Sequence, residues 1–255
     1  MKIYSHKMFS QIFLQDTDTI HSIINFFNPK SGENILEIGP GNGELTKHLL
    51  KKCSNIFAIE IDYNLSKKLT NKFKKNIYLY QEDATKFNFS KLHKKKIRII
   101  GNLPYHITSS LLLHIIKYIP YIQDMYFMLQ KEIVERIIAK PNNKKFGRLS
   151  IIMQYHFKIK KLLYINAKKF FPIPKVDSIF FSLKPYYISP FGKVNTEILS
   201  KVTKIAFQKR RKLLTNSLNK NIIKKLKIST FKRPESIHIK DWVKISALYQ
   251  DLNLL

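Results

Sequence analysis

Short apolar segments alternate with helical segments through the first half of this 255-residue chain. A run such as residues 97–101 (Ile-Arg-Ile-Ile-Gly) is typical of a strand that is buried on both faces of a parallel sheet. The predicted strands are 34–38, 55–60, 77–80, 97–101 and 124–129, and the predicted helices are 16–27, 44–52, 65–73, 108–118 and 131–139. This alternation predicts β-α-β units and therefore a parallel, Rossmann-like α/β sheet.

The pattern changes in the second half of the chain. The predicted elements there are a helix that follows Gly147 and runs to about Tyr155, and strands at 157–164 and 178–183. Two prolines bracket an expected linker at 185–190, and from Thr196 onward the sequence is helical and basic. We therefore expect an α/β domain at 1–188 and a small, basic, all-helical domain at 189–255.

Cysteine usage and hydropathy limit the class of protein. Cys53 is the single cysteine, so a disulfide within the chain is excluded. Since the sequence has no signal peptide and no apolar run near 18 residues, we expect a soluble cytoplasmic protein with no membrane partner. No Cys/His cluster has metal-ligand spacing, so we expect no metal and disfavour a zinc deaminase. No dimer seam is visible, and we expect a monomer.

The charge points to a polyanionic partner, most simply nucleic acid. The formal net charge is +29, with 46 Lys and Arg against 17 Asp and Glu. Nucleotide bias explains part of the lysine excess but not its distribution, because residues 198–234 contain no acidic residue. A solvated helical face remains the plain explanation for any single base among Lys201, Lys204, Lys209, Arg210, Arg211, Lys212, Lys220, Lys224, Lys225, Lys227, Lys232 and Arg233.

A compact glycine loop, Gly39-Pro40-Gly41-Asn42-Gly43, follows the first predicted strand. Glycines let a backbone approach a ligand closely. The loop does not fit the dinucleotide pattern Gly-x-Gly-x-x-Gly/Ala, because the last position is Glu44 or Thr46, depending on the glycine from which the count begins. With Glu37 just before it, the loop suits a site for S-adenosylmethionine. An ordinary strand-to-helix turn remains the alternative.

Acidic residues end the successive strands. Glu60 ends the second predicted strand and can accept both hydroxyls of a ribose. Asp83 follows the third strand, where it can accept from the adenine amino group of the cofactor. With Glu37, these acids also suit a positively charged sulfonium. The alternative is that such acids cap the following helices, as we expect for Asp62.

The tetrad Asn102-Leu103-Pro104-Tyr105 follows the fourth predicted strand, at the sheet edge where α/β proteins bind ligands. An adenine amino nitrogen is a poor nucleophile because its lone pair is delocalised into the ring. The Asn102 oxygen and a backbone carbonyl near Leu103 can accept its two N–H bonds and stabilise the charge that develops. Tyr105 can stack on the base. The alternative is an Asn-initiated turn with Tyr105 in the core.

His106 adjoins the tetrad and invites assignment as a general base. We interpret it instead as a neutral or surface histidine. The methylated amine cation is acidic enough to lose its proton to water, and histidine catalysis requires a partner geometry.

These residues together resemble the small-subunit ribosomal RNA adenine N6,N6-dimethyltransferases, the bacterial dimethyladenosine transferase family. The resemblance spans nearly the whole chain. It rests on Glu37-Ile38-Gly39-Pro40-Gly41, Glu60-Ile61-Asp62, Asp83-Ala84, Gly101-Asn102-Leu103-Pro104-Tyr105, Phe171-Pro172-Ile173-Pro174-Lys175-Val176-Asp177-Ser178 and Ala206-Phe207 with Arg210-Arg211-Lys212. The basic C-terminal motif is the more diagnostic part, because large-subunit rRNA methylases share the catalytic motifs.

The resemblance implies two methyl transfers to each of two adjacent adenines, in a hairpin loop near the 3′ end of small-subunit rRNA. It implies that S-adenosylmethionine contacts Leu14, Gly39, Glu60, Asp83 and Asn102. Residues Asn102, Leu103, Pro104 and Tyr105 would hold the target adenine. The basic residues Lys209, Arg210, Arg211 and Lys212 would bind RNA.

The chain departs from the family at Ile12, which stands where the family's N-terminal signature has Asn or His as a cofactor contact. A contact at this position must then be made by the backbone. His106 also replaces a common Asn. Two other functions stay open. One is adenine methylation of large-subunit rRNA, because large-subunit methylases share the catalytic motifs. The other is a ribosome-assembly factor with weak or lost catalysis, because the polar residue at position 12 is missing.

Overall fold

A computed structural model describes residues 12–92, 95–104 and 106–254. Tyr105, Ser10 and Gln11 lie outside the described residues. The chain divides into two compact units. The first consists of the residues up to Lys131 together with Ile159–Pro185, and the second consists of Glu132–Lys158 and the residues from Tyr186 onward.

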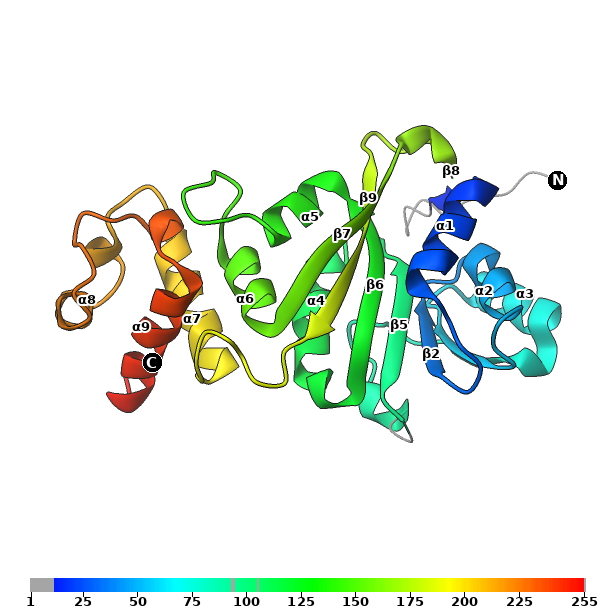
Figure 1. The fold of residues 1–255 in the computed structure, drawn as a ribbon, viewed down its shortest axis with the longest axis horizontal. Helices are drawn as coiled ribbons and strands as arrows, with labels where there is room; N and C mark the ends of the chain where they lie inside the picture. The colour runs from blue at the N-terminus through cyan, green and yellow to red at the C-terminus, as the bar shows by residue number, and fades with distance from the viewer. Residues whose placement is uncertain (1–11, 93–94, 105, 255) are drawn as a thin grey trace. The chain divides into compact units, whose positions relative to one another are not determined.

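A seven-stranded sheet forms the first unit, with the order β4-β3-β2-β5-β6-β9-β7 (Figure 1). The strands are β2 (Asn34–Ile38), β3 (Ile56–Ile59), β4 (Ile77–Tyr80), β5 (Ile97–Asn102), β6 (Ile122–Gln130), β7 (Phe157–Ile165) and β9 (Ser178–Pro185). Strands β2 to β6 are parallel, whereas β9 runs antiparallel to β6. The Rossmann-like sheet that the sequence predicts is confirmed.

The strand order reverses beside β2, which lies between β3 and β5. Ligands of open α/β sheets bind outside the carboxyl ends of the strands at such a switch point. The two strands approach closely here, because a Cβ atom on Gly101 would lie 2.4 Å from the carbonyl oxygen of Ile38. Glycine is therefore required just before Asn102, and it brings the tetrad against the glycine loop.

Helices flank the sheet. They are α1 (Thr17–Phe27), α2 (Glu44–Leu49), α3 (Tyr63–Phe73) and α4 (Thr108–Ile115). Two of those described, α1 and α3, begin at the predicted caps. Asp16 accepts from the Thr19 N–H at the start of α1, and Asp62 accepts from two N–H groups at the start of α3. Ile20, Ile23, Ile24 and Phe27 of α1 are buried in one core cluster with Ile35 and other strand residues. The predicted helix at 108–118 ends early because the next segment, Ile116–Tyr121, is a 3-10 helix that contains Pro120.

The structure also contains a short two-stranded sheet that the sequence does not predict. Strand β1 (Phe13–Leu14) pairs antiparallel with β8 (Phe170–Phe171), and the two segments lie near α1 in Figure 1. The Gln15 N–H donates to the Lys169 carbonyl at 3.0 Å, and Lys169 forms an ion pair with Asp16 at 2.7 Å. Two-residue strands are too short for periodicity to reveal.

The second unit is mainly helical in its described residues. Its helices include α6 (Arg148–His156), α7 (Thr196–Gln208), α8 (Lys220–Lys225) and α9 (Ile239–Asp251), and α5 (Lys131–Ile137) begins at its boundary. Trp242 of α9 is fully buried, and its ring lies 5.9 Å from that of Phe207. No helix among the described residues is long and apolar enough to cross a membrane.

The domain boundary at 188/189 stays a prediction. The compact units change over at 185/186, and the second unit also includes residues 132–158. Hydrogen bonds help to explain why residues 132–158 form part of one unit. Gln154 Nε2 of α6 donates to the carbonyls of Ile137 and Ala139 at 2.8 Å each. These bonds tie α6 to the end of α5. Linker composition cannot reveal a unit that is discontinuous in sequence, because it marks only one point along the chain.

Candidate active site

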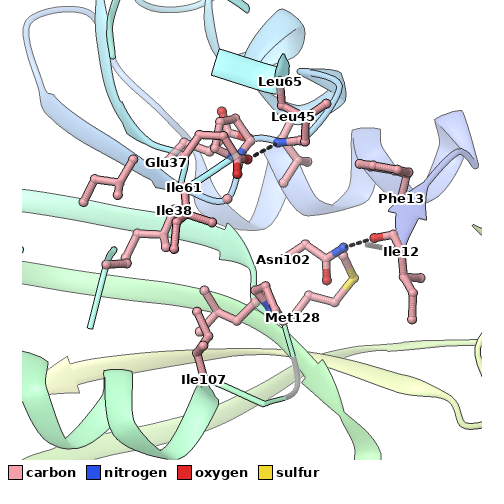
Figure 2. A pocket seen from close by; sticks show the side chains of 18 of the residues that line it. Ile12, Phe13, Glu37, Ile38, Leu45, Ile61, Leu65, Asn102, Ile107 and Met128 are labelled. Carbon is pink, nitrogen blue, oxygen red and sulfur yellow. Dashed lines mark hydrogen bonds between the residues drawn. The ribbon is translucent and has the colours of Figure 1, made fainter. Parts of the chain in front are cut away.

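A cavity of about 340 Å³ opens at the carboxyl ends of β2, β3 and β5 (Figure 2). Most of the site residues proposed from the sequence line it together. These are Leu14, Gly39, Glu60, Asp83, Asn102, Leu103 and Pro104. Tyr105 lies outside the described residues. The sheet therefore brings together side chains that lie up to 90 positions apart in the sequence.

The glycine loop forms one wall of the cavity. Gly39 and Gly41 have positive φ angles of 67° and 57°, a region that L side chains rarely adopt. The Gly41 N–H donates to Oε2 of Glu60 at 3.2 Å. A Cβ atom on Gly41 would lie 2.8 Å from Cε1 of Phe13, so the ring of β1 packs directly on this loop. Backbone conformation and packing both require glycine at position 41.

Glu60 is fixed at the end of β3 and is 7% exposed. Its Oε1 accepts from the Asp62 N–H at 3.0 Å, while Oε2 accepts from Gly41. Each carboxylate oxygen keeps a further lone pair, so both can still accept from a ligand hydroxyl. Burial raises the pKa of this carboxyl, and the backbone N–H bonds from Asp62 and Gly41 oppose that rise. The bonds hold the side chain in a single orientation beside the cavity.

Glu37 lies deeper and is 1% exposed. The Thr46 hydroxyl donates to its Oε2 at 2.6 Å. Burial raises the pKa of Glu37 to about 7, opposed by the Thr46 bond and assisted by the nearby charge of Glu60. Because its pKa lies near neutral, a positive charge placed in the cavity would lower that pKa and favour the ionised form of Glu37.

Asp83 lies in a local turn rather than at a helix cap, and its contact with the cofactor stays a prediction. Its Oδ1 accepts from the backbone N–H and the hydroxyl of Thr85, both at 2.8 Å, which closes a local turn. The residue also lines the cavity. The turn occupies Oδ1 and fixes the carboxylate at the cavity wall. Asp62, by contrast, caps α3, as the sequence predicts.

Asn102 ends β5, and its side chain is held by a backbone group of the N-terminal segment. Asn102 Nδ2 donates to the Ile12 carbonyl at 3.0 Å, as Figure 2 shows. Because a carbonyl oxygen can only accept, the amide must turn its NH₂ group toward Ile12. No donor among the described residues bonds to Asn102 Oδ1.

The backbone of the tetrad is also fixed. The Leu103 N–H donates to the Met128 carbonyl at 3.2 Å. The Pro104 carbonyl accepts from the Thr108 hydroxyl at 3.1 Å, at the start of α4. His106 is exposed at the rim of the cavity. The proline turn is therefore tied to both β6 and α4.

The four basic residues proposed for RNA binding differ in their surroundings. Arg210 Nε forms a 2.8 Å ion pair with Glu235, and its guanidinium also donates to the Lys144 carbonyl. Lys209 Nζ donates to the Asn216 carbonyl at 3.4 Å. Arg211 and Lys212 are exposed in the turn that follows α7. RNA binding by these residues stays a prediction.

Sequence reasoning did not propose Phe13, whose ring packs on Gly41 and lines the cavity, or Thr46, which bonds to Glu37 without lining the cavity. It expected a backbone contact at Ile12, and the structure shows that the Ile12 carbonyl accepts from Asn102. A backbone acceptor leaves no signature in side-chain identity. The sequence does show Thr46 as a polar residue in the first turn of a predicted helix. No group of three metal-ligating side chains is found within the described ranges.

Comparison with known proteins gives a consistent family. The sequence matches the family described as "Ribosomal RNA adenine dimethylase" over residues 4–251. Similar curated proteins carry the name "Ribosomal RNA small subunit methyltransferase A". The one from Blochmanniella floridana is 44% identical over 95% of this chain and 93% of its own length. The one from Legionella pneumophila (strain Corby) is 42% identical over 96% of this chain and 98% of its own length.

Solved structures share the fold. A dimethyladenosine transferase from Plasmodium falciparum superposes with a TM-score of 0.80 at 25% identity, covering 94% of this chain and 98% of its own. A 23S rRNA methyltransferase superposes with a TM-score of 0.69 at 21% identity. The superposition covers 92% of this chain and 98% of the methyltransferase. The second likeness bears on the fold alone.

Proposed function

Because this chain belongs to the ribosomal RNA adenine dimethylase family, we propose that its cavity binds S-adenosylmethionine beside a target adenine of small-subunit rRNA. The protein is an rRNA adenine dimethyltransferase of the 16S type. The position of Asn102 at the switch point, with Oδ1 available beside the cavity, is the observation that carries the assignment of the site.

The cavity fits the cofactor by its chemistry. Glu60 offers carboxylate oxygens to ribose hydroxyls, and Asp83 offers an acceptor to the adenine amino group. The glycine loop lets the backbone approach, since a side chain on Gly41 would strike Phe13. Glu37 supplies a buried carboxyl that balances a positive charge. Leu14 is 5% exposed and provides an apolar wall.

When bound, S-adenosylmethionine supplies a methyl group activated by a positively charged sulfur. The chain's own residues prepare the nucleophile. Asn102 Oδ1 accepts one N–H of the target amine, and the Leu103 carbonyl accepts the other. The Pro104 carbonyl is less suited because it already accepts from Thr108. The two acceptors draw electron density toward the nitrogen and stabilise the positive charge that develops on it.

The remaining steps need no further catalytic group. The two acceptors would leave the lone pair of the amine nitrogen available to take the methyl group that the cofactor supplies, and the proton on nitrogen would then leave to water. Tyr105 would hold the base in line by stacking. His106, exposed at the rim, is not required as a base. Unpaired adenines in an RNA loop are extruded at low cost, which favours such a substrate.

The test supplies tritiated S-adenosylmethionine with unmethylated small or large ribosomal subunits. We expect label in small-subunit RNA, and Asn102→Ala should slow transfer by about 100-fold or more because one acceptor is lost. Label confined to large-subunit RNA would overturn the choice of substrate. An Asn102→Ala protein that methylates at the wild-type rate would overturn the mechanism. Absence of cofactor binding by calorimetry would favour an assembly factor.

A further inference from the structure

The segment before β1 reaches the catalytic amide from the far end of the sequence. The acceptor for Asn102 Nδ2 is the carbonyl of Ile12, 90 positions earlier. Its partner is therefore a backbone atom, whose chemistry does not depend on which side chain stands at position 12. Its placement depends only on the path of the chain.

Strand pairing fixes that path. Phe13 lies opposite Phe171, and Leu14 lies opposite Phe170. Hydrogen-bonded and non-bonded pairs alternate along an antiparallel ladder. Since Gln15 donates to Lys169, the register assigns Phe13 to a bonded pair with Phe171. The backbone groups of Phe13 then face β8, and the Ile12 carbonyl is directed away from it, toward Asn102.

Packing holds the same segment in place. Leu14 and Phe170 are buried in the core cluster. The Phe13 ring lies on the glycine loop, and the Asp16–Lys169 ion pair closes the base of the pairing. The residues that follow Ile12 are thus held by core packing, by the contact of Phe13 with the glycine loop and by an ion pair, and together they fix where the Ile12 carbonyl lies.

The bond has a chemical consequence for Asn102. A free asparagine amide can rotate by half a turn and exchange its NH₂ and oxygen. In the reversed orientation it would present N–H donors to an amine that also offers N–H donors. The N–H groups of Asn102 and of the target amine would then repel each other, and the amine would lose Oδ1 as an acceptor. An acceptor fixed beside Nδ2 disfavours the reversed orientation, because two oxygens would then face each other.

We infer that the backbone carbonyl of Ile12 is a positioning group that keeps Asn102 Oδ1 directed at the target amine. The inference rests on the proposed methyl transfer at Asn102. A role for the backbone carbonyl explains how an apolar side chain is tolerated at position 12, where the family's N-terminal signature has a polar one. The carbonyl performs its role whatever the side chain is.

A backbone ester tests this directly. Replacing Phe13 by its α-hydroxy acid turns the Ile12 carbonyl into an ester carbonyl, which is a weaker acceptor. The change also removes the Phe13 N–H from the ladder. The same replacement at Leu14 weakens the Phe13 carbonyl instead and leaves the Ile12 carbonyl an amide. Both esters disturb β1–β8 pairing, and only the first weakens the acceptor of Asn102.

We expect kcat of the Phe13 ester to fall about 10- to 100-fold below that of the Leu14 ester, with similar KM values for S-adenosylmethionine. Equal kcat values in two folded esters would overturn the inference. If the wild-type protein transfers no methyl group, the proposed function fails instead. The two failures are therefore distinguishable.

NMR of the wild-type protein provides a test that does not depend on folding of the esters. The Asn102 side-chain amide signal is assigned by its loss in Asn102→Ser. We expect its protons to exchange with solvent at least about tenfold more slowly than those of an exposed asparagine such as Asn221. Exchange as fast as at Asn221 would overturn the inference.

Discussion

The hydroxyl of Thr46 donates a 2.6 Å hydrogen bond to Oε2 of Glu37, an acid that is buried beneath the cavity. This bond joins the first turn of α2 to the end of β2. It lowers the pKa of Glu37, but burial outweighs it and leaves the pKa near 7. The pair therefore couples proton binding to the stability of the fold.

Glu37→Gln should change how stability depends on pH. The pKa of Glu37 rises from 4.5 in the unfolded chain to about 7 in the fold, so the native state binds the extra proton. Stability of the wild type therefore falls as pH rises from about 4.5 to 7, by roughly 3 kcal/mol for this group. The variant lacks that loss. Urea denaturation at pH 5 and pH 8 should show its relative stability increasing by about that amount, and a constant difference would contradict the assigned pKa.

Thr46→Val should destabilise the fold by about 1–2 kcal/mol, because Glu37 loses its donor while both residues stay buried. Thr46→Ser retains the hydroxyl and serves as the matched control. We expect the serine variant to lose less stability than the valine variant in denaturant titrations. The reverse order would show that the methyl group of Thr46, rather than its hydroxyl, is the important contact.

Gly41→Ala should weaken cofactor binding by about tenfold or more, because the added methyl displaces Phe13 from the glycine loop. Gly32→Ala is the control. Gly32 has a similar positive φ of 78°, but an added Cβ meets nothing within 4 Å. Both variants incur backbone strain of about 1 kcal/mol. Calorimetry with S-adenosylmethionine separates them, and equal affinities would refute a role for the Phe13 contact.

Arg211→Ala should weaken binding to small ribosomal subunits more than Arg210→Ala does. Arg210 is already paired with Glu235, whereas Arg211 is exposed. For Arg211→Ala we expect the slope of log affinity against log salt to decrease by about one. Filter binding at several salt concentrations measures both variants. A larger effect of Arg210→Ala would indicate that its ion pair with Glu235 opens on the RNA.

Local signals in the sequence gave correct predictions for much of the fold. The strands β2 and β4 occur with the predicted bounds, and Asp16 and Asp62 cap the predicted helices. Apolar periodicity and capping act between residues a few positions apart, so one stretch of sequence contains the whole interaction. The small sheet of β1 and β8 was missed because its strands are two residues long and some 157 positions apart.

Residue types and their places at strand ends were enough to propose Gly39, Glu60, Asp83 and Asn102 as neighbours, because parallel strands end at one edge of a sheet. The orientation of Asn102 and the pairing of Arg210 were decided only by the tertiary structure. Both depend on groups distant in sequence, and one of those groups is a backbone carbonyl that every residue carries. Sequence identifies which side chains can do chemistry, whereas packing determines which of their atoms remain free to do it.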